Sequence, residues 1–268
     1  MTEKAYVNLE VKETGVAVLT LDNAPLNLNT LTTLDRLKEA CKAITADTRV
    51  RVVVVTGAGD RAFCAGSDIS EFAHVREDVV PRKLARENEA FTAIEELPVP
   101  VIAALNGVTL GGGAEIALAC DIRIMDETTR IGFPEVKLGV FPGSGGVFRL
   151  PKLVGPAHAY ELLYSGELID AREAHRIGLV NRLASAGKAL SDALALSETL
   201  ASRPALALSL IKSGVRDAVR QDTQEATVRT LADSHLVFTG PDIAEGVDAF
   251  FAKRPAVFSA PRPVHQED

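Results

Sequence analysis

The strongest indication of the fold is PVIAALNGVTLGGGAEIALACDIRIM, residues 100–125. It begins with a short apolar run at residues 101–105, passes through a turn dense in glycine into a short apolar helix, and ends in a second run at residues 121–125. Short apolar runs on either side of a helix are typical of parallel strands that are covered on both faces. The stretch therefore predicts one βαβ unit with a right-handed crossover.

The same pattern of short apolar runs and amphipathic helices extends toward the N-terminus. RVVVVT at residues 51–56 is another continuous β-branched run, and residues 16–21 alternate as a strand would. Between them, residues 31–47 place apolar side chains on one helical face, with charged residues between them. Strands that alternate with helices at this spacing predict an α/β fold.

The last third of the chain is mostly helical in pattern. No linker rich in Gly, Ser or Pro separates it from the strand-rich part. We expect a core of residues 1–200 and a C-terminal helical subdomain of residues 201–268. The expected helices cover residues 156–164, 171–177, a long Ala/Leu stretch to 202, and then 205–219, 222–238 and 242–251.

Composition and charge disfavour several classes of partner. The 268 residues carry a net charge of −7, which disfavours nucleic acid or an anionic membrane as a partner. No apolar run approaches the ~20 residues that a membrane helix needs. Three cysteines without CxxC spacing and five histidines without HExxH spacing predict no metal site. With no signal-like start, these features predict a cytoplasmic location.

Two glycine motifs look functional at first sight. Residues 57–62, GAGDRA, fit a loose dinucleotide fingerprint, but loop rather than helix follows the glycines. Residues 142–146, PGSGG, suggest a nucleophile elbow, but Pro142 stands where that motif needs glycine. We interpret the first as a turn and reject the second as a hydrolase motif.

Two further glycine-flanked segments carry candidate chemistry. Residues 63–69, FCAGSDI, and residues 111–115, GGGAE, would let a ligand approach backbone N–H groups closely. Tight packing explains either segment equally well. Glu115 falls in the first turn of an apolar helix, and Glu135 follows a proline in IGFPEVKLG. If both carboxylates meet near the amides, they can hold one water and exchange its protons with a substrate.

These segments occur together, in this order, in one known family. The chain resembles the crotonase superfamily, and within it enoyl-CoA hydratase. The resemblance rests on residues 23–31 (NAPLNLNTL), 62–69 (AFCAGSDI), 100–124, 132–146 (GFPEVKLGVFPGSGG) and 245–254 (EGVDAFFAKR). It implies a spiral of ββα units with a C-terminal helical trimerisation region, assembled as a homotrimer or as a homohexamer of two trimers.

The resemblance also implies a substrate and roles for residues. The substrate is an acyl-CoA thioester, whose carbonyl oxygen is bound by the backbone N–H groups of Ser67 and Gly112. Glu115 activates the water and Glu135 protonates C2 of a trans-2-enoyl-CoA, which gives a 3-hydroxyacyl-CoA. No cofactor is implied, because coenzyme A is part of the substrate.

Coenzyme A is expected along two loops whose backbone groups recognise the adenine. The resemblance assigns it Pro25, Leu26, Leu28, Ala65, Asp68 and Ile69. Lys253 matches a family lysine that reaches the phosphates from a neighbouring subunit, or it is a cation at a helix end. The Ser67 hydroxyl and the Phe133 ring depart from the side chains common in the family.

Two alternatives stay open. One is another reaction of the family, either double-bond isomerisation or hydration of an aromatic-pathway acyl-CoA. The other is a non-catalytic relative that binds RNA. The mixed charges of residues 31–47 and the acidic balance disfavour RNA binding.

Overall fold

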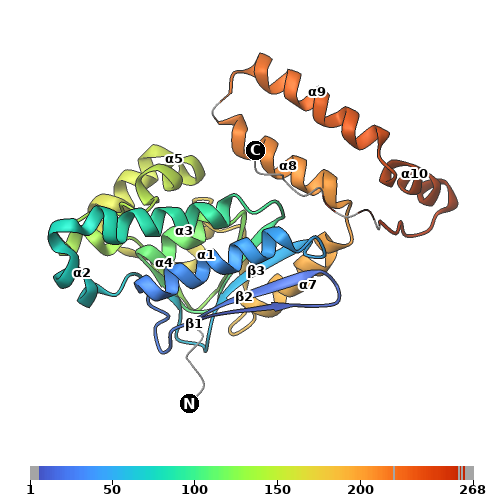
Figure 1. The fold of residues 1–268 in the computed structure, drawn as a ribbon. Coiled ribbons are helices and arrows are strands. Elements are labelled where there is room, and N and C mark those ends of the chain that lie inside the picture. The colour runs from blue at the N-terminus through green and yellow to red at the C-terminus, as the bar shows by residue number, and fades with distance from the viewer. Residues whose placement is uncertain (1–5, 220, 259, 261, 263–268) are drawn as a thin grey trace.

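The computed structural model describes residues 6–219, 221–258, 260 and 262. Its strands form two sheets, with the helices packed around them (Figure 1). The six-stranded sheet has the order β1-β2-β3-β5-β7-β10: Tyr6–Val11, Val16–Asp22, Val52–Gly57, Val101–Leu105, Ile122–Asp126 and Arg182–Ala184. The four-stranded sheet has the order β4-β6-β8-β9: Ala62–Cys64, Val108–Leu110, Arg130–Gly132 and Leu168–Asp170.

The chain winds between the two sheets. It passes from β3 to β4, from β5 to β6 and from β7 to β8, and helical structure follows each pair. Neighbours in this series run parallel, with β3 beside β5 and β4 beside β6, for example. Among the described strands, only two pairs are antiparallel: β1 with β2, and β8 with β9. The spiral of ββα units that the resemblance implied is confirmed.

Ten α-helices are present in the described residues. They are α1 Leu31–Ala46, α2 Ile69–Val75, α3 Ala85–Glu95, α4 Gly112–Ala119, α5 Gly146–Ser165, α6 Ala171–Arg176, α7 Ala189–Ala201, α8 Ala205–Ala218, α9 Thr223–Thr239 and α10 Asp242–Ala252. Shorter helical turns cover η1 Arg76–Asp78, η2 Val80–Leu84 and η3 Pro134–Leu138.

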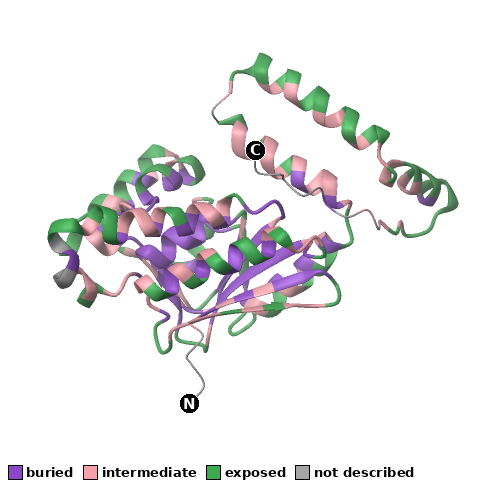
Figure 2. Ribbon diagram, viewed as in Figure 1, coloured by how far each residue is buried: buried purple, intermediate pink, exposed green. Residues whose placement is uncertain are grey.

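The inner strands β3, β5 and β7 of the six-stranded sheet are buried on both faces, whereas the edge strands β1 and β10 are partly exposed (Figure 2). Alternate residues of β3 enter two different cores: Val53 and Val55 pack with α1, α3 and α4, and Val52 and Val54 pack with α7. Each face therefore needs an apolar side chain, which is why RVVVVT is apolar without interruption.

The C-terminal helices leave this core. After α7, which covers the sheet, α8, α9 and α10 extend away from it (Figures 1 and 2); α9 is largely exposed, and most residues of α8 are half-buried. The end of α7 at Ala201 lies beside the boundary that the sequence predicts, although the division into two domains stays a prediction. No single helix of the described residues has the length and apolar character to cross a membrane, and α7 and α8 would meet that test only as a pair bent by 112°.

Some local predictions were wrong. The sequence predicted helix only from residue 156, but α5 already begins at Gly146, at the end of the PGSGG loop. Gly155, at φ 75° and ψ 163°, is not helical and separates α5 into two parts, so the helix predicted from residue 156 is present and residues 146–154 are the part that the sequence missed. Residues 108–110 were predicted as turn and form β6.

Candidate active site

Two parallel strands deliver the predicted amides to one place. β4 and β6 are neighbours, so the loop after β4 and the N-terminus of α4 after β6 meet at the same edge of the sheet. A β-carbon added at Gly112 would lie 3.6 Å from the Ser67 nitrogen and 3.1 Å from its Oγ, and one added at Gly66 would lie 3.7 Å from the Gly112 nitrogen. The structure therefore brings the two predicted oxyanion donors together around a space that a side chain would fill.

Glu115 lies in the first turn of α4 and is 3% exposed. Its Oε1 accepts hydrogen bonds from the N–H groups of Ser144 at 2.9 Å and Gly146 at 2.8 Å, at the start of α5. Burial raises the pKa of Glu115 to about 8, and the charges of Glu135 and Glu87 act in the same direction. Both donors bind one oxygen, which leaves Oε2 for a water or a substrate proton.

Glu135 lies in the short helix η3. A β-carbon added at Gly111 would lie 3.0 Å from its Oε1, which places Glu135 beside the N-terminus of the Glu115 helix. Its Oε2 is buried and has no hydrogen-bond partner among the described residues. Burial raises the pKa of Glu135 to about 7, and the charge of Glu87 adds to this. The two predicted glutamates thus share one poorly hydrated site at the amides.

The two predicted coenzyme A loops lie side by side. The Ala65 N–H donates to the Leu26 carbonyl at 3.0 Å, the Asn29 N–H to the Gly66 carbonyl at 2.9 Å, and the Asp68 N–H to the Asn29 carbonyl at 3.0 Å. These bonds align residues 25–29 with residues 65–69, so the predicted residues Pro25, Leu26, Leu28, Ala65, Asp68 and Ile69 lie on two adjacent segments, one of which contains Ser67.

Asp68 and Lys253, two of the predicted binding residues, do not present their side chains to the site within this chain. The Asp68 side chain accepts hydrogen bonds from the N–H and hydroxyl of Ser70, and these bonds lower the pKa of Asp68. Its carboxylate therefore caps the start of α2. Lys253 directly follows α10, and in Figure 1 the helix α10 lies away from α4. Within one chain, the structure does not bring Lys253 to the site.

Sequence reasoning missed three polar side chains at the site. Asn29 is fully buried, and its Nδ2, which has no partner among the described residues, lies 3.0 Å from the β-carbon position of Gly112. Glu87 and Ser144 are buried beside it. A signal for Glu87 was present: it precedes the buried residues of α3, Ala90, Phe91 and Ile94, at helical spacing, where an apolar residue is expected.

No group of three or more His, Cys, Asp or Glu side chains within the described parts of the chain is arranged to hold a metal ion. Residues 58–61 form the turn between β3 and β4, as the sequence predicted for the GAGDRA motif. What the site offers is backbone amides and carboxylates.

Comparisons with known proteins agree with this geometry. Residues 11–261 match the family model for enoyl-CoA hydratase/isomerase. The chain is 38% identical to a crotonyl-CoA hydratase of Syntrophomonas wolfei, covering 95% of this chain and 98% of that protein. It is 39% identical to a short-chain-enoyl-CoA hydratase of Clostridium acetobutylicum, covering 91% of this chain and 94% of that protein.

Solved structures show the same fold. An enoyl-CoA hydratase of Bacillus anthracis superposes with a TM-score of 0.91 at 34% identity, covering 94% of this chain and 98% of the other. A second structure, an enoyl-CoA hydratase of Geobacillus kaustophilus, gives a TM-score of 0.91 at 32% identity, covering 96% and 98%. The chain belongs to the enoyl-CoA hydratase/isomerase family.

Proposed function

We propose that this protein is an enoyl-CoA hydratase, which adds water syn across the double bond of a trans-2-enoyl-CoA to give a 3-hydroxyacyl-CoA. The observation that carries the proposal is the pair Glu115 and Glu135, two carboxylates with raised pKa values beside the amides of Ser67 and Gly112. The relatives named crotonyl-CoA hydratase and short-chain-enoyl-CoA hydratase support a short acyl chain.

The amides stabilise the charge that forms during the reaction. When water adds to C3, the electron pair of the double bond moves toward the thioester, and negative charge gathers on its carbonyl oxygen. The N–H groups of Ser67 and Gly112 donate to that oxygen, and the positive end of the α4 dipole lies behind Gly112. These donors are held by the fold, so they need no reorganisation as the charge appears.

The glutamates move the protons. Glu115 accepts a proton from the water as its oxygen bonds to C3, and Glu135 gives a proton to C2, so the substrate gains one water in total. This needs one carboxylate ionised and the other protonated. Burial and the charge of Glu135 raise the pKa of Glu115, and burial raises that of Glu135, so the pair holds one proton near neutral pH. The higher pKa of Glu115 places this proton on Glu115 in the free enzyme, so the assigned roles require that it pass to Glu135 when the substrate binds.

The pH dependence of kcat/KM should therefore be bell-shaped. Below a pH of about 7 both carboxyls are protonated and no base is present, and above about 8 both are ionised and no acid is present. We expect a maximum between these values, because kcat/KM reports the free enzyme. Rates of crotonyl-CoA hydration from pH 5 to pH 10 would test this, and a rate that is flat across pH 6–9 would contradict the shared proton.

The function itself is tested by the loss of the enoyl absorbance of crotonyl-CoA. We expect turnover to 3-hydroxybutyryl-CoA by the purified protein. If a 3-enoyl-CoA is converted to its 2-enoyl isomer while crotonyl-CoA gains no water, the protein is an isomerase of the same family instead.

Exposed apolar faces on the C-terminal helices support assembly into a homotrimer or homohexamer. Ile211, Val215 and Val219 follow one another at four-residue spacing on α8 and are 61%, 69% and 62% exposed. Phe250 and Phe251 on α10 are 77% and 78% exposed. Apolar surface of this extent is typical of a protein interface.

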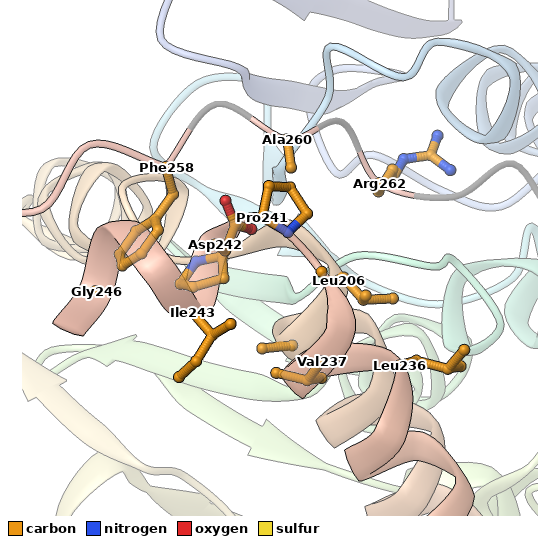
Figure 3. A pocket seen from close by; sticks show the side chains of 13 residues that line it. Leu206, Leu236, Val237, Pro241, Asp242, Ile243, Gly246, Phe258, Ala260 and Arg262 are labelled. Carbon is orange, nitrogen blue, oxygen red and sulfur yellow. The ribbon is translucent and has the colours of Figure 1, made fainter. Parts of the chain in front are cut away.

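A cavity in the same subdomain adds to this surface. It measures about 570 Å³, and Figure 3 shows side chains of α8, α9 and α10 around it, with Phe258 at one side. A neighbouring subunit that covers α10 could also bring its own Lys253 to the coenzyme A phosphates of this one, as the resemblance implies.

We expect sedimentation at micromolar concentration to give a trimer or hexamer. Phe250→Asp places a charge in the exposed apolar face and should shift the protein toward monomer. Thr14→Asp, which adds the same charge to the exposed β1–β2 turn, is the control and should leave the assembly unchanged. A wild-type monomer would rule the assembly out.

The proposal includes a cytoplasmic location and no cofactor beyond the coenzyme A of the substrate. Cys41, Cys64 and Cys120 are free and buried, and burial raises the pKa of each thiol to about 12. Three unpaired cysteines suit a reducing compartment. The carboxylates and amides supply the acid, the base and the charge stabilisation that hydration needs.

A further inference from the structure

A third carboxylate, that of Glu87, is buried between the two halves of the site. Glu87 lies in the first turn of α3 and is 2% exposed. A buried carboxylate is tolerated only where it is paired or hydrogen-bonded, so its partners indicate its role.

Both oxygens of Glu87 accept hydrogen bonds from serine hydroxyls. The Ser67 hydroxyl donates to Oε1 at 2.5 Å, and the Ser144 hydroxyl donates to Oε2 at 2.6 Å. Bonds of this length between a hydroxyl and a carboxylate are strong. One side chain thus connects the loop after β4 to the loop that precedes α5.

Each of these serines also carries a backbone N–H that serves the reaction. The Ser67 nitrogen borders the space beside Gly112, where the thioester oxygen is placed by the proposed function. The Ser144 N–H donates to Oε1 of Glu115 at 2.9 Å. A shift of either serine would move an oxyanion donor or the proposed base, and a displacement of about 1 Å can lower a rate about a hundredfold.

A buried lysine fixes Glu87 from the other side. The Lys83 Nζ lies 3.8 Å from Oε1 of Glu87, and the lysine side chain is fully buried. It donates to Oε2 of Glu71 at 2.6 Å and to the carbonyl of Asn29 at 2.8 Å. The carboxylate therefore sits in a network whose members come from α2, η2, α3 and the coenzyme A loop.

The other ionisable groups around Glu87 are Glu115, Glu135 and the thiol of Cys64. The charge of Glu87 contributes to the raised pKa values of both catalytic glutamates. Cys64 is fully buried, and burial raises its pKa to about 12, so it stays neutral in the working range. Among these groups, Glu115 and Glu135 are the ones whose titration responds to Glu87 near neutral pH.

We propose that Glu87 is a positioning residue, which binds the hydroxyls of Ser67 and Ser144 and so aligns the oxyanion hole with Glu115. This inference rests on the proposed hydratase function. Neither residue that it orients needs a side chain in contact with substrate, because both act through backbone N–H groups.

The test compares Glu87→Ala, Glu87→Gln and the control Glu89→Ala in crotonyl-CoA hydration. Glu89 lies on the same helix but is exposed, where it pairs with Lys38. We expect Glu87→Ala to lower kcat about 10- to 100-fold with little change in KM, since alignment is lost but substrate contacts remain. Glu87→Gln should recover most of kcat, because its amide can accept one serine hydroxyl and donate to the other. Glu89→Ala should match the wild type.

The pH profile separates positioning at the site from general support of the fold. Both Glu87 variants remove a negative charge that raises the pKa values of Glu115 and Glu135. We therefore expect both limbs of the kcat/KM profile to move to lower pH in Glu87→Gln and Glu87→Ala. Glu89→Ala should leave both limbs in place.

Serine variants test the connection itself. Ser67→Ala and Ser144→Ala each keep the backbone N–H and should lower kcat about tenfold or less. If both serines act through Glu87, each serine substitution should lower kcat little further in the Glu87→Ala background. If their roles are independent, the fold-losses in kcat should multiply.

The outcomes are distinguishable. A wild-type protein that does not hydrate crotonyl-CoA overturns the proposed function, and this inference with it. An active wild type whose Glu87→Gln and Glu87→Ala variants keep kcat and both pH limbs overturns the role of Glu87 alone. If Glu87→Ala fails to fold by circular dichroism, the serine variants decide: a fall in kcat in both Ser67→Ala and Ser144→Ala that is not additive in the double variant supports the inference, and an unchanged kcat in both overturns it.

Discussion

Replacing Glu115 or Glu135 by glutamine is expected to lower kcat for hydration at least about a hundredfold while the fold is kept. Glutamine has nearly the shape of glutamate, and in Glu115→Gln its oxygen can still accept the hydrogen bonds from Ser144 and Gly146. The amide can neither take a proton from water nor give one to C2. Because the two glutamates act as a unit on one shared proton, kcat of the double variant should be little lower than that of the less active single variant.

Stability provides the control for this prediction. The folded-state pKa of Glu115 is raised from 4.5 to about 8, so its contribution to stability is present below pH 4.5 and is lost as the pH rises through about 8. Glu115→Gln has no such loss. We therefore expect the melting temperature of Glu115→Gln, relative to that of the wild type, to rise between pH 5 and pH 8.5, while its activity is lost.

That combination would identify Glu115 as a residue held at a cost in stability for the sake of the reaction. A variant that loses activity and melting temperature together at every pH would instead show that the carboxylate supports the fold. Near-normal turnover in both Glu115→Gln and Glu135→Gln would overturn the two-glutamate mechanism.

The fold was predictable where the pattern was long and continuous. RVVVVT and residues 101–105 are strands because both faces of the sheet are covered, and the C-terminal helices follow apolar periodicity closely. The second sheet was not predicted, since β4, β6, β8 and β9 have three residues each, too few to show a period. They were found only through the family resemblance, which implied two strands in each turn of the spiral.

The site was predictable in part from the residues and in part from the resemblance. The residues indicated two glycine-flanked segments and the carboxylates of Glu115 and Glu135, and the resemblance assigned the oxyanion donors to Ser67 and Gly112; the structure brings these four residues together. Glu87 was missed because its partners, two serines, come from distant parts of the chain. A helical pattern shows that a position is buried, but it does not show which hydroxyls meet there.

Gly112→Val is expected to lower kcat about 10²- to 10³-fold, which is the loss typical when one oxyanion donor is removed. The β-carbon would lie 3.0 Å from Nδ2 of Asn29, 3.1 Å from Oγ of Ser67 and 3.6 Å from the Ser67 nitrogen. The two methyl groups beyond it would fill the space that the thioester oxygen needs. By contrast, Ser67→Ala keeps the backbone N–H, so kcat should fall much less. The fall that remains should come from the lost hydrogen bond to Glu87.

The neighbouring glycine separates this effect from packing. A β-carbon at Gly113 would lie 2.0 Å from the carbonyl oxygen of Cys64, a backbone atom that cannot move without shifting β4, so Gly113→Ala should reduce folding itself. The closest atoms at Gly112 are instead side-chain atoms of Asn29 and Ser67, at 3.0 and 3.1 Å, so the steric clash is much milder than at Gly113. Gly112→Val should therefore fold, as circular dichroism would show, and fail at turnover. If it keeps kcat while folded, the thioester oxygen binds elsewhere; and if Ser67→Ala is as damaging as Gly112→Val, the serine hydroxyl rather than its N–H carries the function of that loop.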